Sequence, residues 1–262
     1  MRIVVKVGTS TLAHAGGRLN IRRVELLCKV LSDLKNAGHE IVLVSSGAIG
    51  MGVGKLGLSG RPGDMPGKQA AAAVGQCELM YTYDKMFSEY GHTVAQILLT
   101  AEDIQDKRRS RNVHDTLARL LQWGALPVIN ENDAVATDEI GIQTTIGEND
   151  TLSAIVARLL QADLLVLLSD IDGLYTADPR KNTDAVLIPV VEAITPEIIA
   201  LAGGSGSSMG SGGMATKLKA AQIATEAGID MIIANGEAPE ILYDLFDGKK
   251  VGTRFLGKVC RL

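Results

Sequence analysis

The sequence of 262 residues predicts an α/β fold, a three-layer αβα sandwich around a central, mainly parallel sheet. Short apolar runs alternate with helix-like segments along the whole chain, as in successive βαβ units. Runs such as residues 125–129 and 164–168 contain no polar residue, which is typical of parallel strands buried on both faces. No linker or shift in composition divides the chain, so we expect one domain over residues 1–262.

The elements follow from this alternation in order. The first expected strand, residues 2–7, precedes a helix that Asn20 caps and Gly38 ends. A strand at 41–44 then leads through a glycine turn into another helix. The later elements are helix 68–88, strand 93–99, helix 110–123, strand 125–129, a hairpin-like segment at 135–146, a helix that Asn149 caps, strand 164–168, helix 215–227, strand 229–234 and helix 239–246.

Composition excludes several classes of function. Aromatic residues make up only 3% of the chain, which argues against stacking platforms for single-stranded nucleic acid. The net charge of −4 gives no general attraction to nucleic acid or to an anionic membrane, and no apolar stretch is long enough to span a bilayer. The three cysteines are odd in number and far apart, which predicts reduced thiols and a cytoplasmic protein.

Four polar residues follow the apolar run at 125–129, and they are Asn130, Glu131, Asn132 and Asp133. In open α/β sheets ligands bind just beyond the carboxyl ends of the strands, so we interpret this segment as part of a binding site. The alternative is a plain turn, since Asn and Asp also favour turns and helix caps.

A lysine lies inside the first apolar strand. Because Lys6 is costly to bury, we expect its side chain to reach beyond the strand end toward an anion, where Gly8 would let a ligand approach the backbone. The alternative is an edge-strand lysine that faces water.

Two glycine-containing segments resemble anion sites at helix N-termini. One is the Ser-Ser-Gly-Ala turn at 45–48, and the other is the glycine-rich segment 203–213, after which Thr216 and Lys217 occupy the first turns of a helix. The second is not a Walker A motif, because no glycine directly precedes the lysine. A simple cap and a flexible linker are the alternative interpretations.

Asp150 opens a helix, and Ser169 and Asp170 follow an apolar strand. Ordinary capping would explain Asp150 taken alone. Together, however, two lysines, glycine-lined anion sites and acidic or amide groups at strand ends form the inventory that phosphoryl transfer needs. No Ser/His/Asp arrangement has the order of a hydrolase. We therefore predict a kinase.

Six motifs support a more specific interpretation. They are VKVGT at 5–9, VSSGA at 44–48, NENDAVAT at 130–137, GEND at 147–150, GLYTADP at 173–179 and GGMATK at 212–217. By these motifs, which span nearly the whole chain, the sequence resembles the amino-acid kinase superfamily, and within it the family of glutamate 5-kinases. The resemblance implies ATP-dependent phosphorylation of the γ-carboxylate of L-glutamate to γ-glutamyl 5-phosphate, the first step of proline biosynthesis.

The resemblance also implies roles for individual residues. The expected catalytic residues are Lys6, Lys217, Asp150, Gly8 and Gly47, and the expected glutamate-binding residues are Ser46, Asp133 and Asn149. The expected ATP-binding residues are Lys6, Ser169, Asp170, Ser211, Gly212, Gly213, Met214, Ala215, Thr216 and Lys217. ATP is the implied phosphoryl donor with Mg²⁺, whose ligands the motifs do not identify.

Asp133 can distinguish between two possible substrates. Its carboxylate would accept from the ammonium group of free glutamate, a group that N-acetylglutamate lacks. The alternatives are another kinase of the same fold, such as N-acetylglutamate kinase, and a non-catalytic nucleotide or amino-acid sensor. We further expect a homo-oligomer and, by family resemblance, feedback inhibition by proline, with the segment 135–146 as its place. Many family members continue into a PUA domain, which we do not expect here.

Overall fold

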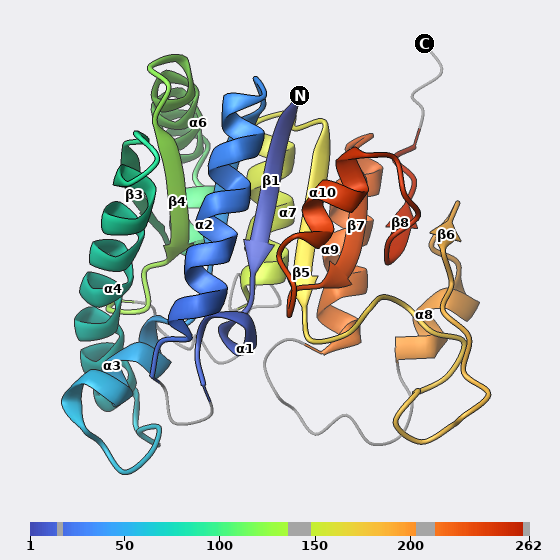
Figure 1. The fold of residues 1–262 in the computed structure, drawn as a ribbon, viewed down its shortest axis with the longest axis horizontal. Coiled ribbons are helices and arrows are strands. Elements are labelled where there is room, and N and C mark those ends of the chain that lie inside the picture. The colour runs from blue at the N-terminus through green and yellow to red at the C-terminus, as the bar shows by residue number, and fades with distance from the viewer. Residues whose placement is uncertain (15–17, 136–147, 203–212, 259–262) are drawn as a thin grey trace.

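The computed structural model describes residues 1–14, 18–135, 148–202 and 213–258. Its centre is an eight-stranded sheet with the order β3-β4-β2-β1-β5-β7-β8-β6, and helices cover both faces (Figure 1). All neighbouring strands pair in parallel except β7 and β8, which are antiparallel. The predicted αβα sandwich with a mainly parallel sheet is confirmed.

The strands of the sheet are short. They are β1 (Arg2–Val7), β2 (Glu40–Ser45), β3 (Val94–Leu99), β4 (Leu126–Glu131), β5 (Leu164–Ser169), β6 (Val190–Val191), β7 (Asp230–Asn235) and β8 (Thr253–Phe255). The helices in the described part of the chain are α1 (Thr9–Leu12), α2 (Ile21–Asn36), α3 (Ala48–Leu56), α4 (Met65–Ser88), α5 (Ala101–Gln105), α6 (Lys107–Gln122), α7 (Asn149–Leu159), α8 (Pro196–Ala202), α9 (Met214–Glu226) and α10 (Ile241–Phe246).

The sheet separates two apolar cores. Alternate residues of β1 point to opposite faces, so Ile3 and Val5 join one core and Val4 joins the other. Helices α2, α4 and α10 cover the first core, while α6, α7 and α9 cover the second. This burial on both faces explains why the central strands are continuous apolar runs.

Helices α3 and α4 pack unusually closely because each has a glycine at the contact. A methyl group on Gly52 would lie 1.8 Å from the carbonyl oxygen of Ala71, and one on Gly75 would lie 1.7 Å from that of Ala48. Both distances are far inside van der Waals contact. The middle of α4 is thereby held against the first turn of α3, next to the glycine turn that follows β2.

Several boundaries differ from the sequence-based expectation. The fourth strand was expected to end at residue 129, but β4 continues through Asn130 and Glu131, which pair with Leu98 and Leu99 of β3. Asn149 is not the cap of its helix, because the N-cap is Glu148 and Asn149 is already helical. The short elements α1, α5, α8, β6 and β8 were not expected, since few residues of each carry a periodic signal.

Two expectations fall largely outside the described residues. The hairpin-like segment at 135–146 is described only at Val135, and the glycine-rich segment 203–213 only at Gly213. In the part of the chain that the structure describes, no helix combines the length and apolarity needed to cross a membrane. Cys28 and Cys77 are free, as expected for reduced thiols, and Cys260 is not described.

Candidate functional site

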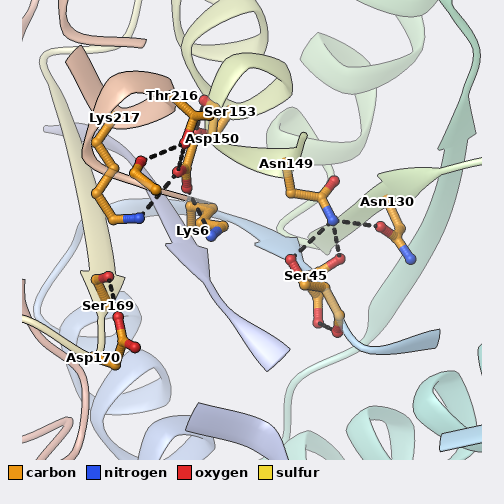
Figure 2. A network of polar contacts seen from close by, with 12 residues as sticks. Lys6, Ser45, Asn130, Asn149, Asp150, Ser153, Ser169, Asp170, Thr216 and Lys217 are labelled. Carbon is orange, nitrogen blue, oxygen red and sulfur yellow. Dashed lines mark hydrogen bonds and ion pairs between the residues drawn. The ribbon is translucent and has the colours of Figure 1, made fainter. Parts of the chain in front are cut away.

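The predicted site residues converge at the carboxyl ends of the central strands. β1 lies between β2 and β5, and Lys6 is in register with Val44 on one side and with Leu167 on the other. The N-termini of α7 and α9 approach the same edge of the sheet (Figure 2). Residues from distant parts of the chain therefore face one another where open α/β sheets bind ligands.

Two lysines from opposite ends of the chain contact a single carboxylate (Figure 2). Lys6 Nζ lies 2.7 Å from Asp150 Oδ1, and Lys217 Nζ lies 3.3 Å from Asp150 Oδ2. Their exposed fractions are only 7% for Lys6, 1% for Asp150 and 3% for Lys217. Thr216 Oγ1 also donates a hydrogen bond of 2.9 Å to Asp150 Oδ2. The interpretation of Asp150 as a simple helix cap is wrong, because α7 has no side-chain cap.

The charge state of this cluster follows from its surroundings. Burial alone would raise the pKa of Asp150, but the neighbouring ammonium groups of Lys6 and Lys217 and the Thr216 hydroxyl outweigh burial and hold the pKa below its ordinary value of 3.8. Asp150 is therefore a carboxylate at neutral pH. Two buried ammonium groups thus share this one carboxylate.

The two glycine turns lie beside this cluster. Gly8 directly follows β1, and a methyl group placed on it would lie 3.6 Å from Lys6 Nζ. Gly47 precedes α3 with φ of 105°, a left-handed conformation that favours glycine, and its Cβ position lies 3.9 Å from Thr9. The Gly8 backbone thus borders the Lys6 ammonium, and the Gly47 turn lies against Thr9, the residue after Gly8.

A second group of polar side chains lies on the other side of Asp150 (Figure 2). Asn149 Nδ2 donates hydrogen bonds of 2.9 Å to Ser46 Oγ and 3.0 Å to Asn130 Oδ1. Its Oδ1 is buried and accepts no hydrogen bond from the described residues. A buried acceptor without a donor is costly, which makes Asn149 Oδ1 a candidate to accept a hydrogen bond from a ligand.

Asp133 borders a cavity of about 370 Å³ between the end of β4, strand β3 and helix α4. Burial raises the pKa of Asp133 above its ordinary value of 3.8, and the charge of Arg61 opposes this only in part. Gln76 and Cys77 of α4 also line the cavity, whereas neither Lys6 nor Lys217 does. The cavity could hold the part of a small ligand that lies away from the lysines.

The residues expected to bind ATP lie on the opposite side of the lysines. Ser169 Oγ donates a hydrogen bond of 3.2 Å to Asp170 Oδ1 at the end of β5, and Figure 2 places both near Lys217. Gly213 is the N-cap of α9, whose first turn holds Met214, Ala215 and Thr216. Ser211 and Gly212 lie outside the described residues.

The structure thus brings Lys6, Asp150 and Lys217 together and places Ser46 and Asn149 beside them. Two participants were missed at the level of sequence. Gln76 is buried in the middle of α4 and accepts a hydrogen bond of 3.0 Å from Asn130 Nδ2. Tyr83, also in α4, bonds to Ser45 Oγ at 2.8 Å. Buried polar residues in an otherwise apolar helix face were the only available signal.

Comparison with known proteins agrees with this geometry. The model of the amino acid kinase family matches residues 1–235. The chain belongs to the amino acid kinase family. The predicted resemblance to glutamate 5-kinases is likewise confirmed by the relatives described next.

Glutamate 5-kinase from Clostridium perfringens is 55% identical over 257 residues, which cover 98% of this chain and 96% of the relative. Glutamate 5-kinase from Clostridium tetani is 58% identical over 253 residues, covering 97% and 93%. The solved structure of carbamate kinase from Giardia lamblia bound to AMP-PNP has a TM-score of 0.69 at 19% identity, covering 98% of both chains. This last likeness supports the fold alone.

Proposed function

We propose that this protein transfers the γ-phosphoryl group of ATP to the γ-carboxylate of L-glutamate, giving γ-glutamyl 5-phosphate, the first step of proline biosynthesis. The observation that carries the proposal is the buried Lys6–Asp150–Lys217 cluster at the strand ends. The glutamate 5-kinases that are 55% and 58% identical over nearly the whole chain support the choice of substrate.

The bond changes require no acid or base from the protein. An oxygen of the γ-carboxylate attacks the γ-phosphorus, an O–P bond forms, and the bond to the β-phosphate breaks with its electron pair leaving on ADP. A carboxyl group with a pKa of about 4.3 is already ionised at neutral pH, so no proton has to move. The barrier is the repulsion between two anions, together with charge on the transferring group.

The two lysines would reduce that repulsion. Lys6 and Lys217 would contact the oxygens of the transferring phosphoryl group, and the backbones of Gly8 and Gly47 would assist. Asp150 holds both ammonium groups in fixed positions, so little reorganisation is needed when charge develops between them. Ser169, Asp170 and residues 211–217 would line the site of ATP.

Glutamate would occupy the side of the site formed by Ser46, Asn149 and Asp133. Its ammonium group needs acceptors. The half-buried Asp133 carboxylate and Asn149 Oδ1, which has no partner among the described residues, are the candidate acceptors on that side. An N-acetylated substrate carries no such charge and would leave Asp133 without a partner. This favours glutamate over N-acetylglutamate.

Mg²⁺ would accompany ATP and supply additional charge neutralisation. The described residues contain no group of three or more His, Cys, Asp or Glu side chains suited to hold a metal. An ion held by phosphate oxygens and waters fits such a site, as is common for Mg²⁺. We also propose a cytoplasmic homo-oligomer that proline inhibits, on the basis of family membership.

A coupled assay of ADP release tests the assignment. With Mg²⁺ and ATP present, we expect turnover with L-glutamate and none with N-acetylglutamate, and we expect chelation of Mg²⁺ to abolish it. Turnover with N-acetylglutamate alone would favour the related kinase. ATP binding without turnover of either substrate would favour a sensor.

A further inference from the structure

Helix α4 carries a buried amide that the proposed reaction does not yet use. Gln76 is 9% exposed, and its neighbours Ala72 and Leu79 on the same helix are buried and apolar. An amide in such surroundings is costly unless its oxygen and nitrogen both form hydrogen bonds. Gln76 Oε1 accepts from Asn130 Nδ2 at 3.0 Å, and Gln76 Nε2 donates to Gln96 Oε1 at 3.5 Å.

The bonds of Asn130 to Gln76 and to the Glu131 backbone together determine which way the Asn130 amide faces. With Nδ2 directed at Gln76, Asn130 Oδ1 faces the other way, where it accepts from Asn149 Nδ2 at 3.0 Å and from the Glu131 backbone at 2.9 Å. A reversed Asn130 amide would point its NH₂ group at two other donors. Gln76 therefore stabilises, together with the Glu131 backbone N–H, one of the two orientations of Asn130.

The orientation of Asn130 in turn determines the orientation of Asn149. Because Asn130 Oδ1 and Ser46 Oγ both accept from Asn149 Nδ2, the Asn149 oxygen must point away from them. That oxygen is the buried acceptor without a partner among the described residues. The three amides thus form a directed chain that begins on α4 and ends at the Asn149 oxygen, and Figure 2 shows its last part, from Asn130 to Asn149.

Close backbone packing fixes the start of this chain. Gly75, next to Gln76, lies so close to the carbonyl of Ala48 that a methyl group on it would be 1.7 Å away. Two turns further along, the Tyr83 hydroxyl bonds to Ser45 Oγ at 2.8 Å. Helix α4 is thereby held at two points to residues 45–48, which include the glutamate-binding candidate Ser46.

We propose that Gln76 is a positioning residue that, through Asn130, orients the Asn149 oxygen toward a hydrogen-bond donor of the amino-acid substrate. For a free amino acid that donor is the ammonium group. This inference rests on the proposed function. It predicts a role in recognising glutamate and none in recognising ATP, because the chain of amides does not extend to Lys217, Ser169 or α9.

Three variants test it. Gln76→Leu keeps the size of the side chain but removes the acceptor for Asn130, so we expect KM for glutamate to rise about tenfold or more, with KM for ATP unchanged within about twofold. Gln76→Glu retains an acceptor oxygen and should stay within about threefold of the wild type. Lys85→Ala alters an exposed side chain of the same helix that does not line the cavity, and should leave both constants unchanged.

The outcomes separate the inference from the proposed function. A wild type that does not phosphorylate glutamate overturns both. The inference alone is overturned if the wild type is active and Gln76→Leu leaves KM for glutamate unaltered. It is also overturned if Gln76→Leu and Gln76→Glu raise KM for glutamate equally, or if KM for ATP rises as much as KM for glutamate. If Gln76→Leu fails to fold, Gln76→Ala replaces it, with the increase in melting temperature on adding glutamate or ATP as the readout.

Discussion

Asp150 is the residue on which the site depends most, because it is the counter-charge of two buried lysines. A buried ion pair contributes little net stability by itself, but removing one partner leaves an uncompensated charge in a medium that solvates it poorly. The proposed reaction joins two anions and therefore needs both lysines. The carboxylate between them thus contributes to the stability of the fold and to catalysis.

Replacing this carboxylate should destabilise the protein. For Asp150→Asn we expect the free energy of unfolding at neutral pH to fall by about 3–5 kcal/mol, measured by urea denaturation. Because the folded pKa of Asp150 lies below 3.8, its contribution is present above that pH and is lost as the pH falls through the lower folded value. The difference between the variant and the wild type should therefore persist down to about pH 3.8. A difference that vanishes well above that pH, or that the exposed Asp84→Asn control also displays, would contradict this role.

Lys217 should act mainly on the chemical step. For Lys217→Ala we predict that kcat falls about 10²-fold or more, as for the loss of a preorganised electrostatic donor. Lys219, two residues later in α9 and exposed, provides a control, and Lys219→Ala should retain kcat. Near-normal turnover of Lys217→Ala in steady-state kinetics would exclude the catalytic role.

Asp133 should act on the binding of glutamate. For Asp133→Asn we predict that KM for glutamate rises about 10- to 100-fold, the loss of a charge-assisted hydrogen bond, while KM for ATP stays constant. Burial raises the pKa of Asp133, so lowering the pH should protonate it before Asp150 and raise KM for glutamate while the lysine cluster is still intact. A KM profile for glutamate that is the same in the variant and the wild type would refute the assignment.

How far single residues could be predicted depended on where they lie in the sequence. Lys6, Asp133, Asp150 and Lys217 stand at the ends of strands or starts of helices, where parallel sheets bind ligands, so their positions alone indicated a site. Gln76 lies in mid-helix without a local motif. Its role depends on Asn130 and Asn149, 54 and 73 positions away, and only the tertiary structure brings them together.

At the scale of elements, the apolar strands were predictable because burial on both faces leaves a continuous apolar run. The first strand was placed at residues 2–7, as β1 is. The end of β4 was not predictable, because Asn130 and Glu131 are strand residues only by pairing with β3. The edge elements β6 and β8 have two and three residues, too few for a periodic signal.

The contact between α3 and α4 can be tested by adding one methyl group. For Gly75→Ala we expect the free energy of unfolding to fall by about 1–3 kcal/mol, because the methyl group would lie 1.7 Å from Ala48 O and must push the helices apart. Gly60→Ala adds the same group in the loop before α4 with no atom within 4 Å, and should be nearly neutral in the same denaturation experiment. Equal stabilities of the two variants would show that the helices separate without cost.

At the scale of the whole molecule, strand order explains why the site needs the entire chain. β1 and β2 contribute Lys6, Ser46 and the glycine turns, whereas α7 and α9 contribute Asp150 and Lys217 from the second half. The sheet order places β5 directly beside β1, so the two halves meet along one strand pair. The candidate glutamate side lies toward β4 and the candidate ATP side toward β5, with the lysines between them.

Trapping the reaction product tests the central claim most directly. An acyl phosphate reacts with hydroxylamine to give a hydroxamate, whereas free glutamate does not. We predict that the purified protein with ATP, Mg²⁺ and L-glutamate forms γ-glutamyl hydroxamate in step with ADP, and that Lys217→Ala forms little. ADP release without hydroxamate, or hydroxamate from N-acetylglutamate but not from L-glutamate, would contradict the account.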